Sequence, residues 1–289
     1  MAGMARDRGA APSDGRSWGR MTRDRDTGRF DHACWGYSDE RERADAAASW
    51  LAEGRRLGQR ALYVADLPRD RLIDEIRAVP LAASSLVAGA LVVFPSFVLY
   101  DLSAPIDPPA QLQVYAHAVE DALSAGYTGL RVAADITPLV ADPARRPAHL
   151  RWEQYAEHYI AEHPLAPMCL FDTRRVSEID AIVCAHPLQG PREPSFALYG
   201  GGATTAALAG EVDALVAETL GEALSALPET DTEIDVSGLA FVDGRAAWTL
   251  QRELVERRAN GHQMVLSHPT NMLRGVWHAC AFDESLLAA

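Results

Sequence analysis

Short apolar segments that alternate with amphipathic segments constrain the fold of this chain more than any other feature. The apolar segments predict strands, and the segments whose apolar residues recur every three or four positions predict helices. The expected strands are 61–64, 91–94, 97–100, 130–135 and 168–171, and the expected helices are 40–57, 72–79, 108–123, 150–161 and 177–185. Apolar strands that alternate with helices pair in parallel and are covered on both faces. We therefore expect an α/β fold with a parallel sheet, whose ligands bind at the carboxyl ends of the strands.

Composition divides the chain into four parts. Residues 1–29 are rich in Arg, Asp, Gly and Ser and predict a disordered arm. The alternating region, 30–187, is the first domain. Residues 188–194 contain Gly190, Pro191 and Pro194 and predict a linker. Residues 195–289 alternate strand and helix again and predict a second, smaller α/β domain.

Charge and residue usage exclude several classes of function. The net charge is −13 over 289 residues, which argues against direct nucleic-acid binding and against docking on anionic membranes. No apolar run reaches the ~18–20 residues of a membrane span. The chain contains no lysine, so Schiff-base and P-loop lysine chemistry is excluded. The four cysteines form no CxxC pair, so we expect a reduced, cytoplasmic setting.

The second domain resembles a STAS domain, the fold of sulfate-transporter tails and anti-sigma factor antagonists. The matching segments are 208–213 (LAGEVD), 234–244 (IDVSGLAFVDG) and the strand at 264–266. The resemblance implies an anti-sigma factor or another STAS or switch protein as partner, bound through the helix that begins after Asp243. Family members carry a phosphorylatable Ser or Thr after this Asp, whereas this chain has Gly244 and Arg245. We therefore expect partner binding through Asp243, Gly244, Arg245 and Trp248, and no phosphorylation at these positions.

The first domain resembles the MEDS domain, the methanogen/methylotroph DcmR-type sensory domain. The matching segments are 31–37 (DHACWGY), 51–66, 132–138 (VAADITP), 152–155 (WEQY), 168–172 (MCLFD) and 184–187 (CAHP). The resemblance implies a RecA/KaiC-like fold and a small organic ligand derived from a hydrocarbon. In a RecA-like nucleotide binder, the loop after the first strand is a glycine-rich phosphate cradle with a lysine. The corresponding residues 32–39 have one glycine and no lysine, so no ATP is expected.

Candidate site residues cluster near the expected strand ends. The ligand-binding candidates are His32, Cys34, Trp35, Tyr37, Asp135, Glu153, Asp172 and His186. A second interpretation is a metal or haem site built from His32, Cys34, Cys169 and His186, because imidazole and thiolate suit zinc, iron and copper. A third is that the cysteines are buried apolar residues and that the carboxylates pair with surface arginines.

These observations predict a cytoplasmic, non-enzymatic signalling protein. A small molecule would occupy the first domain and change how the STAS-like domain meets its partner in anti-sigma factor regulation of transcription. Two alternatives stay open: a ligand-free scaffold with a degenerate RecA-like domain, and an enzyme that uses His32, Cys34 and Asp135. A homodimer is compatible with both domain resemblances.

Overall fold

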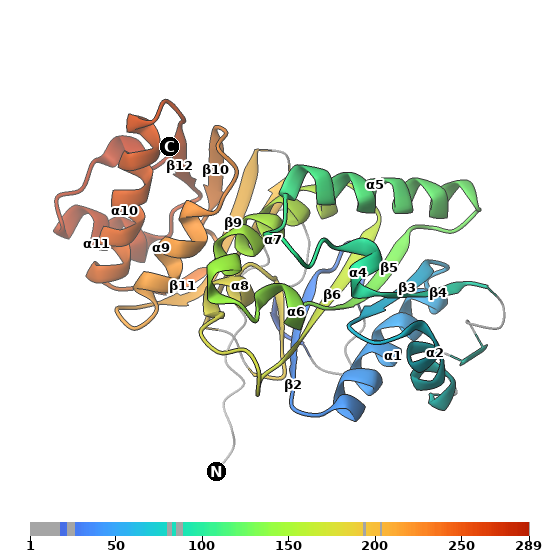
Figure 1. Cartoon of the computed structure of the whole chain (residues 1–289). Coiled ribbons are helices and arrows are strands. Elements are labelled where there is room, and N and C mark those ends of the chain that lie inside the picture. Colours follow the sequence, from blue (N-terminus) through green and yellow to red (C-terminus); the bar gives the residue numbers. More distant parts are fainter. Residues whose placement is uncertain are drawn as a thin grey trace, which may run out of the picture.

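The structure is a computed structural model, and it describes residues 18–21, 27–79, 83–84, 89–192, 195–202 and 204–288. Two β-sheets lie side by side, each covered by helices (Figure 1). The larger sheet is built from the N-terminal part of the chain and the smaller one from the C-terminal part. The two sheets match the two α/β units expected from the alternation of the sequence.

The larger sheet has seven parallel strands in the order β1-β7-β2-β6-β5-β3-β4. Its strands are β1 (Gly19–Arg20), β2 (Ala33–Tyr37), β3 (Arg60–Ala65), β4 (Leu91–Pro95), β5 (Leu130–Asp135), β6 (Leu165–Asp172) and β7 (Leu188–Gly190). The residues of β2 and β5 are buried along their full length, because these strands lie inside a sheet that is covered on both faces. This explains why both faces of these strands are apolar, apart from Arg131 and Asp135 of β5.

Helices cover both faces of the larger sheet. The helices are α1 (Glu40–Arg56), α2 (Arg69–Ala78), α4 (Ser96–Leu99), α5 (Pro108–Ser124), α6 (Thr137–Val140), α7 (Arg146–Ile160) and α8 (Asp180–Cys184). Trp50 and Leu72 anchor α1 and α2 in the core on one face, whereas Tyr115 and Trp152 anchor α5 and α7 in the core on the other. The Asp39 side chain accepts a hydrogen bond from the Glu42 amide and caps α1, as its position before the helix predicts.

The smaller sheet has five strands, and all but one of them run parallel. They are β8 (Phe196–Gly202), β9 (Thr205–Val212), β10 (Thr232–Asp235), β11 (Leu239–Val242) and β12 (Met264–Ser267). The β8 strand pairs with β9 as an antiparallel hairpin, and β9, β10, β11 and β12 pair in parallel. The helices α9 (Ala217–Ser225), α10 (Gly244–Ala259) and α11 (Asn271–Ala279) supply its core together with the strands.

The two sheets meet through α7 and β8. The Gln154 side chain of α7 is fully buried and donates a hydrogen bond to the Leu198 carbonyl of β8 at 3.0 Å. Gly200 of β8 lies directly against the α7 backbone, because a Cβ built at Gly200 would be 2.7 Å from the His158 nitrogen. The side chain of Gln189 adds a hydrogen bond to the Phe196 carbonyl at 3.2 Å. The α7 helix is therefore packed on both sheets.

Four segments differ from the sequence prediction. The segment 32–39, expected to be the loop after the first strand, contains the strand β2, because residues 33–37 are buried and pair with β6 and β7 on either side. Part of the expected arm forms β1, because the Met21 side chain is buried and the Gly19 and Met21 amides donate to the Pro187 and Gln189 carbonyls; residues 1–17 and 22–26 lie outside the described residues. Part of the expected linker forms β7, whose Leu188 is buried in the core. Residues 193–194 of the expected linker lie outside the described residues.

The expected strand at 97–100 is wrong. Residues 96–99 form the short helix α4, which begins directly after Pro95. A proline ring fixes the backbone in a conformation that suits the start of a helix, and the side chains of Phe97 and Val98 are exposed rather than buried on both sides of a sheet.

Among the described residues, none of the helices combines the length and the apolar composition that a membrane span requires.

Candidate metal centre

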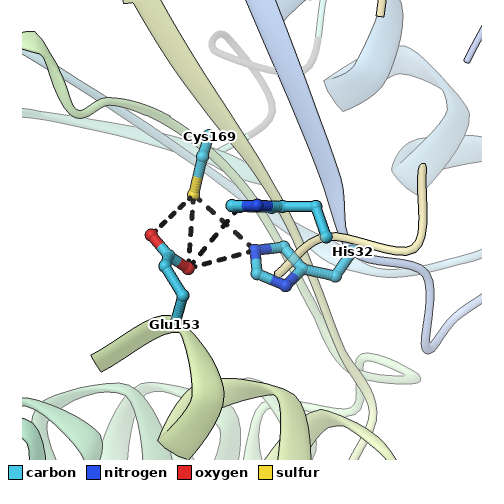
Figure 2. A group of neighbouring side chains, drawn as sticks. His32, Glu153 and Cys169 are labelled. Carbon is cyan, nitrogen blue, oxygen red and sulfur yellow. Dashed lines mark hydrogen bonds and ion pairs between the residues drawn. The ribbon is translucent and has the colours of Figure 1, made fainter. Parts of the chain in front are cut away.

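Four buried side chains from four separate segments converge between the larger sheet and α7. They are His32, which directly precedes β2, Glu153 of α7, Cys169 of β6 and His186, which follows α8. Their ligand atoms all lie within 4.8 Å of one another. Figure 2 shows the side chains of His32 and Cys169 directed from the sheet toward the Glu153 carboxylate. We call these four residues the His–Glu–Cys cluster.

The fold places these residues together for simple geometric reasons. The β2 and β6 strands are neighbours, with Cys34 opposite Cys169 in the parallel register. Side chains alternate between the two faces of a strand, so Cys169 and His32 face the α7 side of the sheet. On α7, residues four positions apart lie on one face, and this places His149, Glu153 and Glu157 in a row above the sheet.

The distances between donor atoms inside the cluster are short. The Cys169 Sγ atom lies 3.6 Å from His32 Nε2 and 3.6 Å from Glu153 Oε1. The Glu153 Oε2 atom lies 3.5 Å from His32 Nε2 and 3.6 Å from His186 Nε2. The rings of His32 and His186 stand 4.1 Å apart between centroids. Every donor atom of the cluster is therefore within 4.8 Å of the other three.

A second layer of contacts holds the cluster in place. Glu157 Oε1 lies 2.7 Å from His32 Nδ1, and the Ile182 carbonyl oxygen lies 2.8 Å from His186 Nδ1. His149 Nε2 lies 2.8 Å from Glu153 Oε1. In each histidine of the cluster, the nitrogen on the outer side of the ring thus has a partner. The inner Nε2 atoms are directed at Glu153.

The electrostatics of the cluster set the charge of each group. Burial alone raises the pKa of Glu153, but the surrounding His186, His149 and His32 outweigh it and lower the pKa to about 2. Burial, assisted by His32, lowers the pKa of His186 to about 4. Burial and the charge of Glu153 raise the pKa of the Cys169 thiol well above its ordinary value. At neutral pH, Glu153 is therefore a carboxylate, His186 a neutral imidazole and Cys169 a thiol.

This set of donors suits a single transition-metal ion. Imidazole nitrogen, thiolate sulfur and carboxylate oxygen are the ligands that Zn²⁺ takes in proteins, usually four in a tetrahedron. Iron and copper accept the same donor types. A haem fits less well, because its four ring nitrogens already surround the iron and leave room for only two protein ligands. Four donors within 4.8 Å of one another match a bare ion.

The other candidate residues from the first domain lie elsewhere. Cys34 is fully buried beside the cluster and is not one of its four donors. Trp35 faces the α1 side of the sheet. Tyr37 and Asp135 meet at the carboxyl edge, where the tyrosine hydroxyl donates to the carboxylate at 2.8 Å.

The carboxylates do not share one site. Glu153 belongs to the His–Glu–Cys cluster, whereas Asp135 lies 3.4 Å from Arg43 and Asp172 forms an ion pair with Arg174 at 2.8 Å. Asp135 and Asp172 do lie on adjacent strands at the carboxyl edge of the sheet, as their positions in the sequence predict. The carboxylates at the carboxyl edge are therefore separate from the His–Glu–Cys cluster. Among the described residues, metal-type donors gather only in the His–Glu–Cys cluster beneath α7.

Sequence reasoning missed the two residues of α7 that support the cluster. His149 and Glu157 are both buried and contact Glu153 and His32. The signal was present in the sequence, because both residues stand four positions from Glu153 on the same helical face. This row of titratable residues on one helical face, together with His32 and His186, indicates where the site lies.

The expected partner-binding residues lie at the start of α10. Asp243 caps the helix, its Oδ1 atom accepting from the Ala246 amide and its Oδ2 atom from the Ala214 amide. Arg245 and Trp248 are exposed, and the guanidinium groups of Arg245 and Arg252 lie 5.3 and 5.1 Å from the Trp248 ring centroid. Arg252 is half-buried and forms an ion pair with Glu253 at 2.6 Å. We call the row Arg245, Trp248 and Arg252 the α10 stripe.

Comparison with known proteins agrees with the larger sheet being a sensory domain. Residues 31–187, more than half of the chain, match the family described as MEDS, the MEthanogen/methylotroph, DcmR Sensory domain. A search of curated proteins finds no match to the chain. The matched segment contains the whole His–Glu–Cys cluster. The chain belongs to the MEDS family.

Proposed function

We propose that this protein is a non-enzymatic signalling protein whose MEDS domain senses a small molecule or ion. A STAS-like domain, built on the smaller sheet, passes the signal to a protein partner. The observation that carries this proposal is the double role of α7. The same helix supplies Glu153 to the buried cluster and Gln154 to the β8 strand of the second sheet.

The contact between α7 and β8 is suited to transmit a displacement. Gly200 lets the β8 backbone approach the backbone of α7 at Glu157 and His158 with no side chain between them. Close-packed interiors move as units and deform little, because few voids take up a shift. A change at Glu153 that moves α7 therefore moves β8 as well. A ligand drives such a change only if it favours one position of the helix over another.

The output side of the proposal is the α10 stripe. Trp248 is 40% exposed, and the arginines beside it are cationic at every physiological pH. Exposed tryptophan and arginine are the residue types that contribute most to protein–protein binding. An acidic surface is the matching partner chemistry. By the STAS resemblance, the partner is an anti-sigma factor or another switch protein, and binding proceeds without phosphorylation at the start of α10.

The test is direct binding to purified anti-sigma factors and STAS proteins encoded in the same genome, measured by biolayer interferometry. Trp248→Ala should abolish binding and leave thermal unfolding unchanged, because the side chain is exposed. Phe97→Ala removes an exposed aromatic side chain from the first domain and is the matched control. Binding by none of these proteins, or equal binding by wild type and Trp248→Ala, contradicts the proposed output.

A further inference from the structure

We propose that His32, Glu153, Cys169 and His186 bind one divalent transition-metal ion of the Zn²⁺ type in tetrahedral geometry. The idea that this ion is the signal rests on the proposed function. The idea that the cluster binds an ion rests on the geometry of the cluster alone.

The distances fall into two groups with different meanings. The outer contacts, such as His32 Nδ1 to Glu157 at 2.7 Å and His186 Nδ1 to the Ile182 carbonyl at 2.8 Å, have hydrogen-bond length. The inner contacts from the two Nε2 atoms to Glu153 Oε2 are 3.5 and 3.6 Å. A charge-assisted N–H···O bond is normally about 2.7–2.9 Å, so the inner atoms are not drawn together by a shared proton.

The inner distances match the edges of a coordination tetrahedron. Metal–ligand bonds of about 2.0–2.3 Å at tetrahedral angles place neighbouring donor atoms roughly 3.3–3.6 Å apart. The nitrogen–oxygen edges here are 3.5 and 3.6 Å. From Cys169 Sγ, the edge to His32 Nε2 is 3.6 Å and the edge to the same Glu153 Oε2 atom is 3.9 Å. Sulfur contacts of this length also fit S–H hydrogen bonds. Only the nitrogen–oxygen distances therefore distinguish metal coordination from hydrogen bonding.

The second layer fixes which atoms carry lone pairs. An imidazole nitrogen beside a carbonyl or carboxylate oxygen must carry the proton, so Nδ1 is the N–H in both His32 and His186. In the neutral His186 ring, Nε2 then directs its lone pair at the oxygen of Glu153. His186 Nε2 is fully buried and has no hydrogen-bond partner among the described residues. Lone pairs that face one another in a buried site repel unless a cation lies between them.

Charge balance points to a divalent ion. When the ion binds, Cys169 loses its S–H proton to solvent and forms a sulfur–metal bond, because a coordinating thiol is deprotonated. The thiolate and the Glu153 carboxylate then supply two negative charges, and the two imidazoles are neutral. A doubly charged cation makes this first layer neutral, which suits a fully buried site. Four protein ligands close the coordination sphere, as in structural and regulatory zinc sites.

The experiment measures metal binding to the full-length protein. Chelator-treated protein is titrated with Zn²⁺ by calorimetry and with Co²⁺ by absorption, and metal content is checked by plasma mass spectrometry. We expect one ion per chain and a thiolate-to-cobalt charge-transfer band. His186→Gln and Cys169→Ser should each weaken binding by at least about 100-fold, more than the loss that second-layer changes typically cause. Cys169→Ser should also remove the band.

His163→Gln is the matched control. The His163 Nδ1 atom contacts the carbonyl oxygen four residues earlier at 2.9 Å, as His186 does, but lies outside the cluster. This variant should bind metal as wild type does. Glu157→Gln keeps all four ligands and should weaken binding by about 10–100-fold while the cobalt band persists. It tests the site even if a ligand variant fails to fold.

Two results would overturn the inference: wild-type protein that takes up neither ion, or a Glu157→Gln protein and ligand variants that bind as tightly as wild type. Partner binding is measured on the same samples. Wild-type protein that binds the partner but takes up no metal refutes the metal site and leaves the output proposal intact. Metal binding without any partner refutes the output and leaves the site intact.

Discussion

Replacement of Gly200 by alanine tests whether α7 and β8 are packed backbone to backbone. The added Cβ atom would lie 2.7 Å from the His158 nitrogen and 2.8 Å from the Glu157 carbonyl carbon. These are backbone atoms of a buried helix and cannot rotate away, so the helix or the strand must shift. Overpacking of this kind costs about 1–3 kcal/mol. For a protein of this size, a loss of about 2 kcal/mol lowers the melting temperature by roughly 4–8 °C.

The assay is thermal unfolding followed by circular dichroism, with Gly201→Ala as the control. A Cβ atom at Gly201 first meets the Thr205 hydroxyl at 3.0 Å, a side-chain atom that can rotate away. Gly201→Ala should therefore change the free energy of unfolding by less than about 0.5 kcal/mol. The packing described for α7 and β8 is incorrect if the melting temperature of Gly200→Ala equals that of wild type. It is also incorrect if both variants lose the same free energy of unfolding.

Four further predictions follow from contacts described by the structure. Gly54→Ala should lower the melting temperature, because its Cβ would clash with Cδ and Cβ of the buried Arg131 and this clash outweighs a helix-propensity gain of ~1 kcal/mol. Gly275→Ala in α11 meets no described atom within 4 Å and should raise the melting temperature by about 2–4 °C. Tyr100→Phe should cost about 1–3 kcal/mol in urea unfolding, because it leaves the buried Tyr115 hydroxyl without its 2.6 Å partner, and the double Phe variant should cost less than the sum of the single ones. Zn²⁺ at 100 times its dissociation constant should stabilise the protein by about 2.7 kcal/mol in thermal scans, and the effect should shrink as the pH falls, because protons compete for the thiolate and the imidazoles.

Much of the fold was readable from periodicity, because a strand buried on both faces must be apolar throughout. The strand β2 at 33–37 escaped prediction because its segment was assigned to a phosphate-loop position by resemblance. The other strands of the larger sheet that escaped are the short ones at 19–20 and 188–190, each with too few apolar residues to produce a pattern. Their pairing depends on the burial of Met21 and Leu188, which only the assembled sheet reveals. The helix at 96–99 was mistaken for a strand because its exposed apolar residues imitate a buried segment.

The candidate site was predictable in its residue types and not in its grouping. His32 and Cys34 do face one side of the sheet, but two residues along a strand are about 6.6 Å apart, too far to share one ion readily. Glu153 was grouped with other carboxylates, whereas the fold places it beside Cys169. Contacts between distant segments depend on strand order, and spacing within the sequence does not encode that order.

The strand order also affects how the sensory domain can be isolated. The family match spans 31–187, whereas β1 and β7 lie outside it and β7 pairs with Ala33, Cys34 and Trp35 of β2. A fragment cut at the family limits would leave the N–H and C=O groups of β2, an apolar strand, open to solvent. Such unprotected edges recruit strands from other chains and lead to aggregation. A fragment that includes residues 18–21 and 188–190 keeps this edge covered and should stay monodisperse where the shorter one precipitates.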